Sequence, residues 1–132
     1  MNPIPDFEGG ERWLVESCLK ERYGKLVTTQ AADVELQLAP GEAQLTTCPT
    51  LYWEERGAAF VVVKAGEGRW RSMFFYPAEA QGEQYGAGRP EYDDLAECVI
   101  AVLRAQADHE KQRLGVSSGK TALDLANGKE AV

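Results

Sequence analysis

Apolar and polar residues alternate with a helical period near the N-terminus. In residues 8–23, Val15 and Leu19 stand one turn apart, and a second apolar row of the same spacing runs beside them. This pattern is typical of a helix that packs one face against a core. Gly24 follows at the position where a left-handed residue commonly ends a helix. We therefore predict an N-terminal helix over residues 8–23.

The same period returns over residues 91–113 and predicts a C-terminal helix. The apolar stripe of this segment consists of Leu95, Val99, Val102 and Leu103. Two signals compete for the start of the helix. Pro90 suits a first helical turn, whereas Asp94 with Glu97 resembles a capping box further along. The sequence leaves both starts open.

Between these segments the pattern changes to the two-residue period of strands and to runs of β-branched and aromatic residues. The predicted strands cover residues 25–29, 34–38, 45–48, 51–55, 58–64 and 69–76. Glycines at residues 65–68 make the link between the last two the strongest hairpin signal. The strand at 69–76 carries large apolar side chains on both faces, which predicts a central position. Residues 77–90 are rich in glycine and proline and predict an exposed loop.

The order helix, strands, helix predicts an α+β fold. We expect a two-layer sandwich, with an antiparallel sheet of four to six strands flanked by an N-terminal and a C-terminal helix. A chain of 132 residues is long enough for one well-packed core and leaves little for a second. We assign residues 1–114 to a single α+β domain and residues 115–132 to a flexible polar C-terminal tail.

Charge and cysteine content narrow the classes of partner and compartment. The chain has 21 acidic and 14 basic side chains and a net charge of -7, which argues against direct nucleic-acid binding and against anionic membranes. The charge is -3 over residues 1–40, -1 over 41–80 and -3 over 81–132, so we expect acidic helices beside a nearly neutral sheet. An odd count of 3 cysteines without a secretion signal favours free thiols and a cytoplasmic location.

The residues that carry chemistry in enzymes are sparse and scattered. His109 is the only histidine, and it would serve Cys48 as a base only if the second helix ended beside that cysteine. No paired-cysteine motif for a metal is present. Residues 115–121 and 56–63 partly resemble a phosphate-binding loop and an RNA-binding strand, but both lack the required context. We expect no enzyme activity, no metal and no cofactor.

Aromatic residues and arginines concentrate in the strand region. Trp, Tyr and Arg are the side chains that protein interfaces favour, and a sheet covered by helices on one face leaves its other face open. We therefore predict a partner-binding surface on the sheet and the following loop. Its candidate residues are Tyr52, Trp53, Arg69, Trp70, Arg71, Tyr85 and Arg89.

These patterns predict a non-enzymatic, intracellular accessory, regulatory or inhibitory protein that acts by protein–protein interaction. Its acidic surface suits a protein partner with a basic patch, such as a nucleic-acid-binding enzyme or complex, and a homodimer is a further arrangement that we keep open. A small acidic chaperone is another version of the same class. The alternative is a small-ligand-binding protein or small enzyme with a pocket under the 77–90 loop, where Tyr85 and Arg89 would supply polar contacts.

Overall fold

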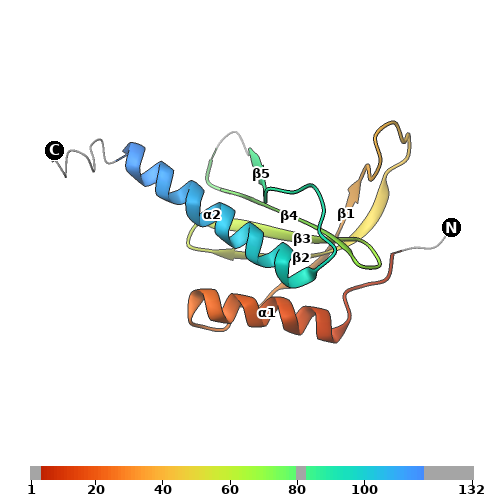
Figure 1. The fold of residues 1–132 in the computed structure, drawn as a ribbon, viewed down its shortest axis with the longest axis horizontal. Coiled ribbons are helices and arrows are strands. Elements are labelled where there is room, and N and C mark those ends of the chain that lie inside the picture. Colours follow the sequence, from red (N-terminus) through yellow and green to blue (C-terminus); the bar gives the residue numbers. More distant parts are fainter. Residues whose placement is uncertain (1–3, 80–82, 118–132) are drawn as a thin grey trace.

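Five strands and two helices make up the computed structural model, which describes residues 4–79 and 83–117. The elements are α1 (Gly9–Tyr23), β1 (Gln30–Leu36), β2 (Thr46–Glu55), β3 (Ala58–Gly66), β4 (Arg69–Phe75), β5 (Gln84–Gly86) and α2 (Leu95–Ser117). The strands form one antiparallel sheet in the order β1-β2-β3-β4-β5, and both helices lie on the same face of it (Figure 1). The predicted α+β two-layer sandwich is confirmed.

Local hydrogen bonds explain where α1 begins and ends. Glu8 caps the helix, and its backbone N–H donates to the Glu11 carboxylate at 2.7 Å in a reciprocal capping box. Gly24 adopts the left-handed conformation, with φ 72°, and its N–H donates to the carbonyl of Lys20 at 2.8 Å. The helix therefore covers nearly the predicted residues and presents the buried Val15 to the sheet.

The start of α2 agrees with the later of the two predicted signals. Asp94 caps it, because the Asp94 carboxylate accepts the backbone N–H of Glu97 at 2.9 Å. The helix runs to Ser117, so it passes the predicted boundary at residue 114. Residues 118–132, most of the predicted tail, lie outside the described residues.

The predicted strand at 25–29 is wrong, because these residues connect α1 to the sheet. The carboxylate of Glu16 accepts hydrogen bonds from the backbone N–H of Thr29 at 2.9 Å and from its hydroxyl at 2.7 Å. Contacts with α1 thus take the place of sheet pairing at this residue. The first strand starts one residue later and overlaps only part of the predicted 34–38.

The two strands predicted on either side of Pro49 are one strand, β2. Pro49 lies opposite Asp33 of β1, and the pairing of β2 with β3 begins at the next residue, Thr50. The proline therefore occupies a position with a paired neighbour on one side only, where the loss of its backbone N–H is best tolerated.

The predicted hairpin between β3 and β4 is confirmed, with a register shift between Lys64 and Gly66. The segment predicted as a 77–90 loop needs correction, because it contains β5, which pairs with β4. The next segment stays beside β4 as well, since Trp70 and Tyr92 exchange backbone hydrogen bonds of 2.9 and 2.8 Å. The strand β4 is therefore internal, as its two apolar faces predicted.

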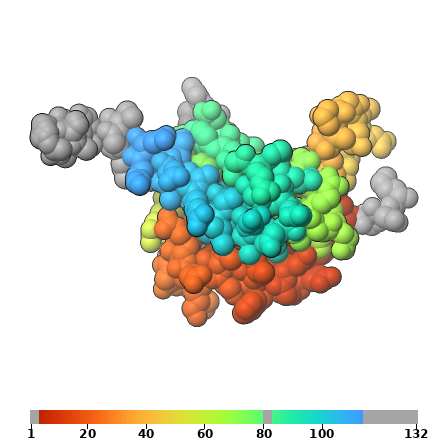
Figure 2. Space-filling view, viewed as in Figure 1, coloured from red at the N-terminus to blue at the C-terminus, as the bar shows by residue number. Residues whose placement is uncertain are grey.

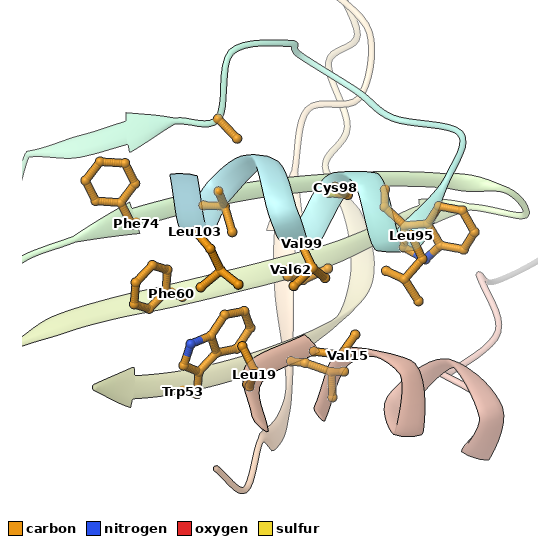
Figure 3. Close-up of a cluster of buried hydrophobic side chains, with 14 of the residues drawn as sticks. Val15, Leu19, Trp53, Phe60, Val62, Phe74, Leu95, Cys98, Val99 and Leu103 are labelled. Carbon is orange, nitrogen blue, oxygen red and sulfur yellow. The ribbon is translucent and has the colours of Figure 1, made fainter. Parts of the chain in front are cut away.

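The core lies between the sheet and the helices. Trp53, Phe60 and Phe74 come from three adjacent strands and pack beside side chains of both helices, such as Leu19 of α1 and Leu103 of α2 (Figure 3). The rings of Trp53 and Phe60 stack with centroids 5.2 Å apart and planes 9° apart. The hydroxyl of Ser72 donates to the carbonyl of Cys98 at 3.1 Å and fixes α2 against β4.

The acidic charge does not reside within the helices, contrary to the prediction. Each helix contains three acidic and three basic side chains within its bounds. Both helices run from right to left in Figure 1, and acidic residues such as Glu8 and Asp94 precede them. Carboxylates at helix N-termini complement the helix dipole. The excess acid therefore lies mainly in the connecting segments.

Candidate binding surfaces

The structure places the two tryptophans of the predicted interface in the core. Trp53 is 2% exposed and Trp70 is 8% exposed, and both face the helices. The prediction of an exposed face that includes them is therefore wrong. The physical reason is that the bulkiest side chains of β2 and β4 gain most by burial, and the helices cover the face to which these residues belong.

Arg69 and Arg71 lie on the sheet face opposite Trp70, because successive side chains of a strand alternate, and they share one carboxylate. Glu91 accepts from Arg69 Nε at 2.9 Å, from Arg69 Nη2 at 3.0 Å and from Arg71 Nε at 3.1 Å. The hydrogen bond from Arg69, followed by that from Arg71, holds the pKa of Glu91 below its ordinary value despite its partial burial. This cluster joins β4 to the segment before α2, so both arginines have structural partners.

One end of the sheet face opposite the helices is covered by the chain that follows β1. Arg71 Nη2 donates to the carbonyl of Leu38 at 3.1 Å, which brings this chain over β4. Cys48 and Val63 are 0% and 1% exposed at this end. Because β1 and β4 are not neighbours in the sheet, this contact shows that the chain after β1 crosses this face as far as β4.

The other end of this face carries four half-buried apolar side chains, Tyr52, Val61, Met73 and Phe75, which we call the open patch. Tyr52 lies directly opposite Val61, and Val61 lies directly opposite Met73. Both helices lie on the opposite face (Figure 1), and within residues 4–79 and 83–117 no helix lies over the patch. Large apolar side chains from three strands therefore face solvent together.

Polar side chains surround the open patch. The Tyr52 hydroxyl donates to the carboxylate of Glu54, and this bond raises the pKa of Tyr52 to about 12. Gln30 lies opposite Tyr52 on β1, and Gln84 lies opposite Phe75 on β5. An apolar centre with a polar rim is the usual composition of a protein interface.

Only one of the predicted sheet residues, Tyr52, belongs to the open patch. The sequence reasoning missed Val61, Met73 and Phe75 as candidates for binding. Strand alternation placed Met73 and Phe75 on the face opposite Trp70, so a signal was present. Alternation alone does not show which of the two faces the helices cover.

Tyr85 and Arg89 lie in different environments, although the sequence grouped them. The Tyr85 ring contacts Phe74 and His109 at centroid distances of 5.1 and 4.3 Å and lines a shallow hollow of about 430 Å³. Arg89 instead lies over the ring of Tyr92 at 5.0 Å. The hollow therefore has Tyr85 but not Arg89 in its wall, and the two polar contacts predicted for a ligand are not assembled.

Cys48 and His109 lie on opposite faces of the sheet and form no nucleophile–base pair. His109 packs on the helix side, where its Nδ1 lies 3.0 Å from the Tyr76 hydroxyl oxygen. Burial raises the pKa of the Cys48 thiol, and it raises that of Cys98 to about 11. Both thiols are therefore protonated at neutral pH. In the described part of the chain, no three His, Cys, Asp or Glu side chains gather as metal ligands would.

No family model, no curated protein and no solved structure matches the chain. Within the described residues, neither helix is long and apolar enough to cross a bilayer.

Proposed function

We propose that this protein is an accessory or regulatory protein that binds another protein through the open patch. The observation that carries the proposal is the alignment of Tyr52, Val61 and Met73 across three adjacent strands on the face without helices. A contiguous apolar surface with a polar rim is the usual mark of an interaction site, whereas single exposed apolar residues need no explanation.

The partner class follows from charge. The last 15 residues hold two acidic and two basic side chains, so the whole net charge of -7 belongs to residues 1–117. A charge of this size steers basic partners toward the surface and disfavours acidic ones. We therefore assign to the open patch a basic protein that presents an apolar segment flanked by lysine or arginine. The patch then provides the desolvated contact, and the net charge accelerates encounter.

Site-specific photocrosslinking in the source cell tests this proposal. A benzoylphenylalanine residue replaces Tyr52 in one variant and Phe75 in another, because an aromatic replacement preserves the packing of the sheet. The matched control carries it in place of Trp13, which is 71% exposed on α1. We expect the two patch variants to crosslink to the same segment of one basic protein, and the control not to do so. Mass spectrometry identifies the segment and its flanking charges.

Three outcomes would overturn the proposal. The first is crosslinking to that protein from the Trp13 position but not from the patch. The second is a partner segment without apolar residues or without flanking basic residues. The third is a crosslink to a second copy of this chain, which would make the patch a homodimer interface instead. Raised salt should also reduce crosslinking yield, because long-range attraction is screened.

A further inference from the structure

A second surface, independent of the open patch, lies between the two helices. Figure 2 shows α1 and α2 side by side on this face of the molecule. A pocket of about 290 Å³ lies in the groove between them, and its apolar wall is formed by Cys18, Ile100, Leu103 and Ala107. Ile100 is 41% exposed, although it is a large aliphatic side chain. At roughly 30 Å³ for each water-sized group, the pocket has room for a chain of about ten heavy atoms.

A polar hollow of about 260 Å³ lies beside the apolar pocket, at the C-terminal end of α1. Arg22 and Ala107 line both spaces, so the pocket and the hollow are adjacent. Arg56 and Lys111 add two more basic groups to the hollow. The guanidinium groups of Arg22 and Arg56 both lie near the ring of Tyr23, at 5.7 and 5.4 Å from its centroid. This shared ring holds the two cations in one small region.

The carboxylates that line the hollow are already paired with other bases. Glu55 lies 2.7 Å from Lys25, and Glu110 lies 3.3 Å from Arg113. Among the described residues, neither Arg22 nor Arg56 forms an ion pair with a carboxylate. The hollow is thus a cationic site on a protein whose net charge is -7.

The second basic group at the apolar pocket, beside Arg22, is Arg104, which also lacks an ion pair within residues 4–79 and 83–117. Glu21 is the single acidic residue in this wall. Burial and the neighbouring Glu21 raise the pKa of the Cys18 thiol, so this side chain is protonated at neutral pH and presents an uncharged surface to the pocket. An apolar pocket beside a basic hollow suits a ligand that is apolar at one end and anionic at the other.

We infer that the cleft between α1 and α2 binds a single-chain amphiphile with an acidic head group, such as a medium-chain carboxylate. Its chain lies along Ile100 and Leu103, and its head group lies at Arg22 and Arg56. A free amphiphile fits better than an anionic bilayer, because a net charge of -7 repels a surface of like charge, whereas a single anion meets only the local basic groups.

Titration of the full chain with decanoate, below its micelle concentration, tests the assignment by calorimetry. We expect saturable binding of one decanoate per chain. Arg22→Glu should weaken it at least tenfold. Lys20→Glu makes the same charge change on the same helix, at a residue outside both spaces, and should weaken binding less than twofold. Ile100→Gln removes part of the apolar wall and should weaken decanoate binding at least tenfold, as Arg22→Glu does. Its control is Leu26→Gln, at a residue that is 79% exposed and outside the pocket, and this variant should bind decanoate as the wild type does.

Two further measurements separate this site from general surface binding. Decyltrimethylammonium has the same chain and the opposite charge, and it should bind at least tenfold more weakly than decanoate. Decanoate should slow the alkylation of Cys18 by N-ethylmaleimide in proportion to occupancy, because the ligand covers that wall of the pocket.

The inference is overturned if decanoate does not bind saturably at millimolar concentration, or if Lys20→Glu weakens binding as much as Arg22→Glu. Equal affinity for the cationic amphiphile would also contradict it. Binding of the protein to phosphatidylglycerol vesicles without binding of free decanoate would assign the cleft to a membrane surface instead. Each variant is accepted only if its melting temperature matches that of the wild type.

Discussion

Lys64 offers the sharpest test of how the two layers are held together. It lies on the central strand β3, and its side chain is 2% exposed. Its ammonium group contacts the Glu11 carboxylate at 3.0 Å and the Asp6 carbonyl at 3.3 Å. Glu11 is 21% exposed and also accepts the backbone N–H of Glu8. If the ion pair is broken, water can therefore solvate the Glu11 carboxylate but not the buried Lys64 ammonium group.

This difference predicts an asymmetry between the two single variants. Glu11→Gln leaves a buried ammonium group without an anion, and removal of one partner of a buried pair costs about 3 kcal/mol of unfolding free energy. Lys64→Met removes the charge but keeps an unbranched side chain of similar length. Glu11 then retains the Glu8 N–H and access to water, so the loss is about 1 kcal/mol. The double variant should be more stable than Glu11→Gln alone.

Urea denaturation of the four proteins measures the unfolding free energies and the coupling between the two sites. Glu21→Gln is the matched control, because it makes the same substitution at an exposed position of α1. The reasoning is refuted if Lys64→Met destabilises more than Glu11→Gln, or if the two single effects add within about 0.5 kcal/mol in the double variant.

Three further predictions concern backbone, pH and thiols. Gly57→Ala should destabilise the protein by about 1 kcal/mol, because Gly57 has φ 82°, where a Cβ is strained. Gly10→Ala should stabilise it by about 0.5–1 kcal/mol, because Gly10 is helical with open space around it, and thermal melts should show a lower melting temperature for the first variant and a higher one for the second. Folding lowers the pKa of Glu91 below 4.5, so the stabilisation by its carboxylate is complete above pH 4.5 and is lost as the pH falls through the pKa of the folded protein. In urea titrations, the unfolding free energy of Glu91→Gln should therefore decline less than that of the wild type between about pH 5 and pH 3. In the native protein N-ethylmaleimide should label Cys18 alone, because the other two cysteines are 0% exposed; rapid native labelling of either would contradict the packing.

The fold class follows from the sequence because its signals are local. The helical periods at both ends, the glycine-rich hairpin and the capping pair of Asp94 and Glu97 each act within a few residues. The predictions are wrong where a contact with a residue far away in the sequence decides the local structure. Residues 25–29 have strand-forming side chains, but Glu16 of α1 accepts the backbone N–H of Thr29. Likewise β5 consists of three residues and exists through its pairing with β4.

The candidate surfaces were harder to predict for the same reason. Alternation separates Trp70 from Met73, but it does not say which of the two faces receives the helices. The buried Lys64 and the clamp of Glu91 on Arg69 and Arg71 depend on contacts over 20 or more residues. The cleft between α1 and α2 depends on how two separated helices meet, and no periodicity within either helix encodes that geometry.

The methyl group of Met73 provides the most direct measurement of the central claim. The chain contains 2 methionines, Met1 and Met73, so methionine methyl labelling places one NMR probe in the open patch and one at the N-terminus. On titration with the crosslinked basic protein, the account predicts that the Met73 signal shifts or broadens with saturation at one partner per chain, while the Met1 signal does not change. A Met73 signal that stays unchanged while the complex forms would contradict the assignment of the open patch as the binding surface.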